Sequence, residues 1–233
     1  MKQQNLQNGA DTFLTSVVEA AMPRRTVLFA AGAGGNPERH AGLLEALAAD
    51  CGTIIAPHFD RLKSNYPTEE ELMTRARRMV AAIDALADSN LPLVGEGHSI
   101  GGTLLLALAG GRMWLSRSQP LTMEPVARLA RLVVLAPPTG FYGAPGALDG
   151  MHVPVMAWAG TEDAITPTDQ AKFFRDALGN RVPLDLRVAE GAGHYSFMNV
   201  PPPGTTEPLA DRDAFLEHLA GEIRRYVACV GTS

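Results

Sequence analysis

Short apolar runs alternate along this chain with longer stretches in which apolar residues recur every three or four positions. The runs have the length of buried strands, and the stretches between them have the spacing of amphipathic helices. Strands that alternate with helices form mainly parallel sheets covered on both faces. The pattern therefore predicts an α/β fold with a sheet of about six strands, at 26–31, 53–57, 91–96, 132–136, 153–159 and 184–189.

The N-terminal segment, residues 1–25, is predicted to contain a helix that docks on this sheet. Apolar residues recur at helical spacing between Phe13 and Met22, with Asp11 as an N-cap, and Pro23 would end the helix. Further along, residues 67–71 (PTEEE) read as a capping box before a long helix. No linker or internal repeat interrupts the pattern, so we expect residues 1–233 to form a single domain.

The motif that stands out is G-H-S-I-G at residues 97–101, which joins an apolar run to a second run compatible with a helix. A serine at the apex of such a turn is strained with its hydroxyl exposed, and Gly97 and Gly101 omit the Cβ atoms that would collide there. The Ile100 N–H at the helix start could then face the oxyanion formed when Ser99 attacks a carbonyl. Two alternatives stay open, a turn with a capping serine and a dinucleotide fingerprint without its third glycine.

Serine nucleophiles need a base and a carboxylate that orients this base. Asp163 follows the fifth predicted strand and His194 follows the sixth. Both are candidate partners of Ser99, because ligands bind at the C-terminal ends of the strands in such sheets. Glu162 competes with Asp163 for the role, and each of these side chains could instead be an ordinary loop residue.

Several further side chains are candidates for the surroundings of this site. His98 is expected to pack beside the nucleophile, and the remaining histidines, His58 apart, are expected to be structural. The residues of a candidate substrate pocket, each of which could equally belong to the core, are His58, Phe59, Trp114, Phe141, Tyr142, Tyr195 and Met198.

The composition narrows the partners of the protein. The net charge of -5 arises from 25 acidic and 20 basic residues without a basic block, so no nucleic-acid partner is expected. The N-terminus lacks the apolar core of a secretory signal and no apolar run reaches the length of a membrane span, so we expect a cytoplasmic protein. Cys51 and Cys229 lack metal-site spacing and are expected to be reduced thiols, and no metal is expected.

Three motifs together carry a resemblance to a known superfamily. The sequences G-H-S-I-G-G at 97–102, G-T-E-D at 160–163 before a proline and G-A-G-H-Y-S-F at 191–197 resemble the α/β-hydrolase superfamily, over about residues 26–226. The first and last motifs resemble the predicted dienelactone hydrolase group and its platelet-activating-factor acetylhydrolase relatives. The resemblance implies the α/β-hydrolase fold, a triad of Ser99, Asp163 and His194, and hydrolysis of an acyl substrate without a cofactor.

The chain departs from the pattern of this superfamily. Dienelactone hydrolases use cysteine where this chain has Ser99, so lactone specificity does not carry over. The first loop begins with Ala31 where His is common, and Ala33 is the expected second oxyanion donor, with Gly34 as the alternative. Glu96 replaces an apolar residue and is either buried with a partner or in contact with the site, and its pKa is raised if desolvation dominates. The antiparallel strands that open the superfamily's sheet are expected to be missing.

We therefore expect a serine hydrolase of the carboxylesterase or acyl-hydrolase type that acts on a small acyl ester or thioester. One alternative is a catalytically silent binding or regulatory protein with the same fold, which the departures at Glu96 and Ala31 would favour. Another is a nucleotide-binding protein that uses the loop at 32–35, although Pro37 stands where a third glycine is needed. Neither the oligomeric state nor a lid formed by the loops at 137–151 and 201–208 follows from the sequence.

Overall fold

A mixed sheet of eight strands forms the centre of the molecule in the computed structural model, which describes residues 1–228. The strand order is β1-β2-β4-β3-β5-β8-β9-β10. Neighbouring strands from β4 to β10 pair in parallel, whereas β1 with β2 and β2 with β4 pair antiparallel. The strands are β1 (Lys2–Asn8), β2 (Asp11–Val18), β3 (Arg25–Ala30), β4 (Gly52–Pro57), β5 (Leu93–His98), β8 (Leu129–Leu135), β9 (Val155–Gly160) and β10 (Leu184–Ala189).

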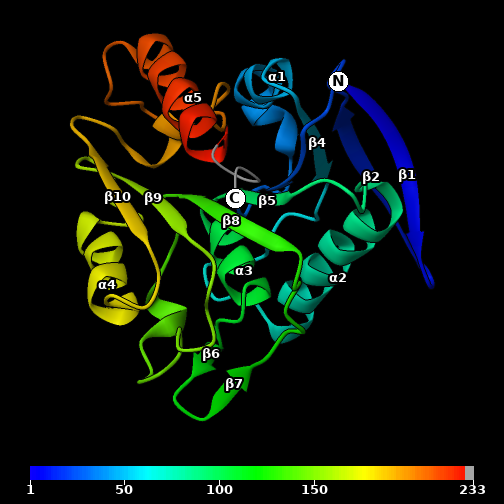
Figure 1. Ribbon diagram of the computed structural model, residues 1–233. Helices are drawn as coiled ribbons and strands as arrows, with labels where there is room; N and C mark the ends of the chain where they lie inside the picture. The colour runs from blue at the N-terminus through cyan, green and yellow to red at the C-terminus, as the bar shows by residue number, and fades with distance from the viewer. Residues whose placement is uncertain (229–233) are drawn as a thin grey trace.

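Helices cover both faces of this sheet, with α1 and α5 on one face and α2, α3 and α4 on the other (Figure 1). Both β3 and β5 are buried along their whole length, which explains why they read as continuous apolar runs in the sequence. The fold class predicted from the sequence is therefore confirmed. The helices are α1 (Ala41–Ala49), α2 (Glu69–Leu86), α3 (Ile100–Leu108), α4 (Thr168–Leu178) and α5 (Arg212–Ala228), with short 3-10 helices η1 (Pro37–His40), η2 (Gly140–Tyr142) and η3 (His194–Phe197).

The start of the chain corrects two expectations, because residues 1–25 form a β-hairpin and contain no docking helix. The turn pairs Asn8 with Asp11 and places Gly9 at φ 62°, a left-handed conformation that glycine adopts without cost. Glycine at the first of the two central turn positions is itself a hairpin signal, and the β-branched residues after it favour a strand. Hence β1 and β2 are the antiparallel opening strands that were expected to be missing, and the main sheet has eight strands where about six were predicted.

One further local prediction, the capping box, agrees with the structure. The side chain of Thr68 accepts a hydrogen bond from the Glu71 N–H, and the Glu71 carboxylate accepts one from the Thr68 N–H, which is the predicted capping box of α2. Between α3 and β8 the chain forms a small hairpin of β6 (Met113–Ser116) and β7 (Gln119–Leu121). Cys51 is a free thiol, and Cys229 lies outside the described residues.

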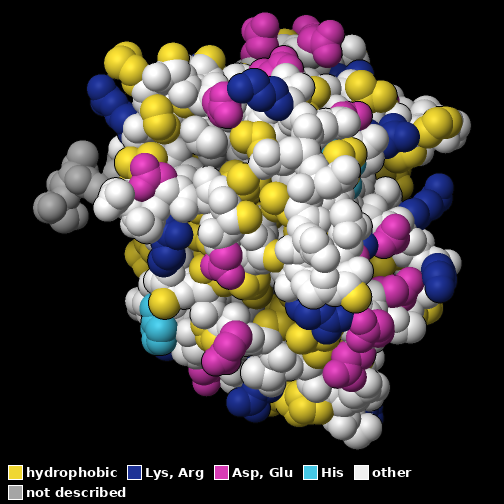
Figure 2. Space-filling model, turned by 90° about the vertical axis from the view of Figure 1, so that its right-hand side faces the viewer, with side chains coloured by type: hydrophobic (Ala, Val, Ile, Leu, Met, Phe, Trp, Pro, Cys, Tyr) yellow, Lys and Arg dark blue, Asp and Glu magenta, His cyan; other side chains and the backbone are white. Residues whose placement is uncertain are grey.

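The surface around β1, β2 and α2 carries acidic and basic side chains interspersed with apolar ones (Figure 2). No helix within residues 1–228 combines the length and the apolar character that a membrane crossing requires.

Candidate active site

Ser99 occupies a strained turn between β5 and α3, as the motif predicted. Its φ of 54° lies in the left-handed region, which is costly for a residue with a side chain. A Cβ atom on Gly97 would lie 2.6 Å from the Gly102 nitrogen, and one on Gly101 would lie 2.1 Å from the Ala30 oxygen. Both contacts are with backbone atoms that cannot move aside, so the turn requires glycine at each position.

Three side chains meet at this turn from three loops at the C-terminal ends of the strands. His194, the first residue of η3 after β10, places its Nε2 atom 3.0 Å from Ser99 Oγ. Its Nδ1 atom lies 2.8 Å from Oδ2 of Asp163, in the loop after β9. The structure thus brings together Ser99, His194 and Asp163, in the serine–base–carboxylate arrangement that nucleophilic catalysis uses. Glu162, the alternative carboxylate, is exposed to solvent.

The carboxylate of Asp163 is enclosed by hydrogen-bond donors. Its Oδ1 atom accepts the N–H groups of Ile165 and Thr166, at 2.8 and 2.7 Å. Burial acts to raise the pKa of Asp163, but the hydrogen bonds from His194 and Thr166 outweigh it, and the pKa lies below its usual value. The side chain is therefore ionised at neutral pH and stabilises a positive charge on the imidazole.

Thr166 is a member of this site that the sequence analysis missed. Its hydroxyl lies 2.6 Å from Oδ2 of Asp163 and 3.1 Å from Nδ1 of His194. It donates to the carboxylate, because ionised acceptors form the shorter and stronger hydrogen bonds. The available signal was a threonine three residues after the aspartate, a spacing at which local side-chain hydrogen bonds are common.

Backbone amides complete the arrangement around Ser99. Ile100 is the first residue of α3, so its N–H has no acceptor within the helix. The loop after β3 lies directly against the turn, since a Cβ atom on Gly32 would be 3.2 Å from the Cβ of Ser99. Within residues 1–228, the N–H groups of Ala33 and Gly34 have no hydrogen-bond acceptor in the protein. Three amides are thus free to bind a negatively charged oxygen.

Solved structures of other proteins resemble this arrangement of strands and helices. An alpha-beta serine hydrolase homologue from Coxiella burnetii is 16% identical, with a TM-score of 0.68 over 97% of this chain and 96% of that one. The chain has the α/β-hydrolase fold. A dienelactone hydrolase from Anabaena variabilis is 19% identical, with a TM-score of 0.63 over 94% of each chain. A Thermogutta terrifontis esterase is 14% identical, with a TM-score of 0.61 over 99% of this chain and 97% of that one. No protein-family model and no curated protein sequence matches the chain.

Two buried histidines stand behind the triad of this α/β-hydrolase fold. His98, which the sequence placed as a packing residue, directs its Nε2 atom to the His194 carbonyl oxygen at 2.9 Å and lies 4.8 Å from the His194 ring. The ring of His40 lies a further 5.2 Å away. Burial lowers the pKa of His98 well below its usual value and that of His40 to about 3, so both rings are neutral. A neutral His98 donates Nε2–H to the carbonyl and holds the backbone of the loop that carries His194.

Glu96 fits neither of the two alternatives that the sequence left open. It is 1% exposed, and no group in the described part of the chain donates a hydrogen bond to either of its carboxyl oxygens. Strand alternation places Glu96 with His98 on the sheet face away from α3, because Gly97 between them faces α3. Desolvation raises the pKa of Glu96 to about 8, so the carboxyl group is protonated at neutral pH.

The seven candidate pocket residues are dispersed by the fold. Tyr195 contacts the His194 ring with a centroid distance of 5.3 Å, and Met198 is buried just beyond η3. Tyr142 is instead a core residue, whose hydroxyl donates to the Thr103 carbonyl at 2.6 Å on α3. Phe141 precedes it in η2 and packs on the core.

The three remaining pocket candidates lie on other elements and contact other residues. Trp114 lies on β6, beyond the C-terminal end of α3, whereas Ser99 precedes the N-terminal end of that helix. His58 turns toward the sheet edge, where its Nε2 atom lies 2.8 Å from Ser16 Oγ on β2. Phe59 is buried under a guanidinium group of α2. Of the seven candidates, Tyr195 is thus the one in ring contact with His194, and a substrate pocket formed by the others stays a prediction.

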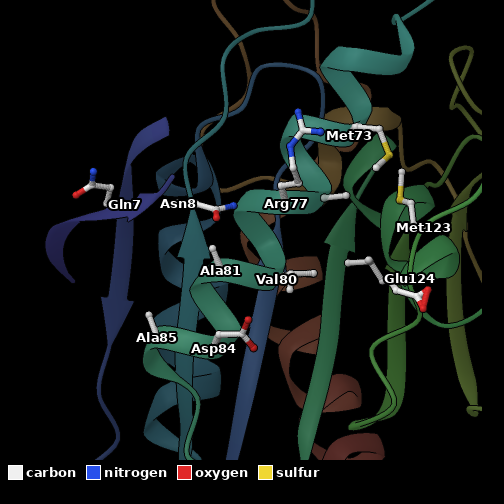
Figure 3. A pocket seen from close by; sticks show the side chains of 12 residues that line it. Gln7, Asn8, Met73, Arg77, Val80, Ala81, Asp84, Ala85, Met123 and Glu124 are labelled. Atoms are coloured by element: carbon white, nitrogen blue, oxygen red, sulfur yellow. The ribbon is translucent and has the colours of Figure 1, made fainter. Parts of the chain in front are cut away.

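A cavity of about 570 Å³ lies beside α2, away from the triad. Figure 3 shows its lining, which comes from α2, from Leu108 of α3, from Gln7 and Asn8 of the opening hairpin, and from Met123 and Glu124 after β7. Neither Ser99 nor its two partners line it. Among residues 1–228 no group of three or more His, Cys, Asp or Glu side chains is placed to hold a metal ion.

Proposed function

We propose that this protein is a serine hydrolase of the carboxylesterase or acyl-hydrolase type, acting on a small acyl ester or thioester through Ser99, His194 and Asp163. The observation that carries the proposal is the continuous pair of contacts from Ser99 Oγ to His194 Nε2, at 3.0 Å, and from His194 Nδ1 to Asp163, at 2.8 Å. These contacts occur at a strained turn beside free backbone amides, which is the full set of groups that acyl transfer needs.

The chemistry follows from the position of each group. His194 accepts the Ser99 proton while Oγ attacks the acyl carbon, and the negative charge that forms on the substrate oxygen is bound by the amides of Ile100 and Ala33. His194 then returns the proton to the departing alcohol or thiol, which leaves an acyl group on Ser99. A water molecule, deprotonated by His194, attacks this acyl group, and the same proton then restores the Ser99 hydroxyl as the acid is released.

The structural neighbours support this assignment through what their own names state. The Thermogutta esterase of similar fold has been phosphoramylated by tabun, an organophosphorus agent. Agents of this class transfer their phosphorus group to activated nucleophiles, so a reaction of the same kind is a test for an activated Ser99 in this chain.

A fluorophosphonate probe and an ester chain-length panel test the proposal together. We expect stoichiometric labelling of Ser99, and we expect Ser99→Ala to reduce turnover of a short-chain nitrophenyl ester by at least about 10³-fold. Labelling at another residue would move the nucleophile elsewhere. A folded protein with neither labelling nor turnover on any member of the panel would reject hydrolysis and indicate a silent binding or regulatory protein.

A further inference from the structure

Arg75 of α2 is a buried cation that hydrogen-bonds only to backbone oxygens. It is 2% exposed, and no ion pair within residues 1–228 includes it. Its Nη1 atom donates to the Gly32 carbonyl at 2.9 Å, and its Nη2 atom donates to the carbonyls of Ala33 and Asp60 at 3.0 and 2.6 Å. The guanidinium group also lies 5.0 Å from the centre of the Phe59 ring. It therefore joins α2 to two loops, one of which borders Ser99.

The loop carbonyls do not need an arginine in order to be hydrogen-bonded. The Gly32 oxygen already accepts the Gly35 N–H at 3.0 Å, and the Ala33 oxygen already accepts the Leu62 N–H at 2.9 Å. Burying a guanidinium group has a large desolvation cost, which lowers the pKa of Arg75 to about 10 and still leaves it charged at neutral pH. Two of the three carbonyls that Arg75 binds thus have another donor, so satisfying those two carbonyls does not account for burying a cation beside them.

Peptide geometry shows what the contacts determine. In a planar trans peptide the C=O of one residue points opposite to the N–H of the next. The Gly32 carbonyl and the Ala33 N–H share one peptide, and the Ala33 carbonyl and the Gly34 N–H share the next. Because Arg75 holds both carbonyls on its own side, both N–H groups point away from it. Neither of these two amides has an acceptor in the described protein, and the loop that carries them lies against Ser99 at Gly32.

We propose that Arg75 is the positioning residue of the oxyanion site: it holds two consecutive carbonyls so that the amides of Ala33 and Gly34 face the charged oxygen of the reacting substrate. This inference rests on the proposed hydrolase function and adds a group that does not touch the substrate. A cation on the carbonyl side also polarises each peptide, which makes the opposite N–H a stronger donor. Both amides, the expected donor and its alternative, are held by the same side chain.

Arg25 provides a matched control at the other end of strand β3. It is also buried, at 6% exposed, and it donates to the Asp50 carbonyl at 2.6 Å while pairing with the Asp50 carboxylate. Arg25→Gln therefore removes a buried guanidinium that bonds a backbone carbonyl, but it does so at the end of the strand remote from Ser99. A loss of activity that Arg25→Gln and Arg75→Gln share has a structural cause. A loss of activity that occurs only in Arg75→Gln is caused by the change in the oxyanion loop.

The experiment compares wild type, Arg75→Lys, Arg75→Gln and Arg25→Gln in hydrolysis of a short-chain nitrophenyl ester. We expect Arg75→Gln to lower kcat by about 10²-fold, the effect of removing one oxyanion donor, with KM changed less than about threefold. The kcat of Arg75→Lys should lie between those of wild type and Arg75→Gln. Its single ammonium nitrogen keeps the positive charge but cannot bind several carbonyls at once as the two guanidinium nitrogens do. Arg25→Gln should lower the thermal midpoint while leaving kcat within about twofold.

A transition-state analogue separates the oxyanion site from general damage. An alkyl trifluoromethyl ketone adds to the serine and forms an oxyanion, so its affinity for Arg75→Gln should fall in parallel with kcat, by about 10²-fold. If Arg75→Gln does not fold, Arg75→Lys serves for the same comparison. Unchanged kcat and ketone affinity in a folded Arg75 variant would overturn the positioning role and leave the hydrolase function standing. A wild type without turnover or Ser99 labelling would overturn both.

Discussion

The hydroxyl of Thr166 lies 2.6 Å from Oδ2 of Asp163, the same carboxylate oxygen that lies 2.8 Å from Nδ1 of His194. One oxygen atom thus accepts hydrogen bonds from both the His194 imidazole and a buried threonine hydroxyl. This shared acceptor fixes the rotation of the carboxylate, because its other oxygen is already bound by the N–H groups of Ile165 and Thr166. The orientation of His194 consequently depends on a residue that does not contact Ser99 in the described structure.

Replacing Thr166 by valine should impair turnover without preventing folding. The variant keeps the shape of the side chain and removes one hydrogen bond to a charged group, which contributes about 1.5–3 kcal/mol. We expect kcat/KM for a short-chain nitrophenyl ester to fall by about 10- to 100-fold. Thr166→Ser, which keeps the hydroxyl, should remain within a few-fold of wild type; equal activities for the two variants would show that the hydroxyl has no influence on the triad.

His98 offers a second test of how the triad is held. His98→Phe preserves an aromatic ring of similar size but loses the Nε2–H donor to the His194 carbonyl, whereas the amide of His98→Gln can donate from nearly the same position. An ordinary buried hydrogen bond contributes about 1 kcal/mol, so kcat/KM should fall by about fivefold or more in the phenylalanine variant and less in the glutamine variant. Steady-state kinetics at one pH measures this difference. A lower kcat/KM for His98→Gln than for His98→Phe would contradict this role of the His98 hydrogen bond.

Glu96 should make the protein less stable as the pH rises. The pKa of this carboxyl is about 8 in the folded protein against an ordinary value of 4.5, so the folded state keeps a proton that the unfolded state has lost between these limits. Stability from this group is therefore fully present below about pH 4.5 and is lost progressively as the pH increases toward 8, at about 1.4 kcal/mol per pH unit.

Glu96→Gln should remove this dependence, because the amide stays neutral in both states. Near pH 4 the wild type and the variant should have similar free energies of unfolding, and near pH 7 the variant should be more stable, by about 3 kcal/mol at most. Urea unfolding at several pH values provides the comparison. The buried histidines change stability equally in both proteins, so a difference that does not grow with pH would refute the desolvated state of Glu96.

Gly101→Ala should prevent the nucleophile turn from forming. The added Cβ would lie 2.1 Å from the Ala30 carbonyl oxygen, a backbone contact that only displacement of β3 or α3 could relieve. We expect the free energy of unfolding to fall by at least about 3 kcal/mol, and we expect hydrolytic activity to be lost. Gly140→Ala is the control, because a Cβ there meets nothing within 4 Å. Soluble yield and the denaturation midpoint measure the stability of both variants. A Gly101→Ala variant as stable as Gly140→Ala would show that the turn tolerates a side chain.

Local sequence patterns were sufficient to predict those features of the fold that depend on residues close together in the chain. The inner parallel strands such as β3 were readable because burial on both faces favours a continuous apolar run, and the turn at Ser99 was readable because glycines lie close on either side of it in the sequence. The segment from Phe13 to Met22 was misread for the same reason. Its apolar spacing is that of a helix, but pairing of β2 with β4, a distant strand, makes residues 11–18 a strand.

The amino-acid sequence by itself determined the parallel strands of the main sheet, the nucleophile turn and the two candidate partners of Ser99, because each is encoded in a short stretch of chain. Only the tertiary structure decided that Thr166 shares the Asp163 carboxylate, that His98 holds the His194 backbone and that Arg75 holds the loop after β3. Two of these contacts join residues 43 and 96 positions apart. Such contacts depend on the packing of distant elements, which no local pattern of apolar and polar residues records.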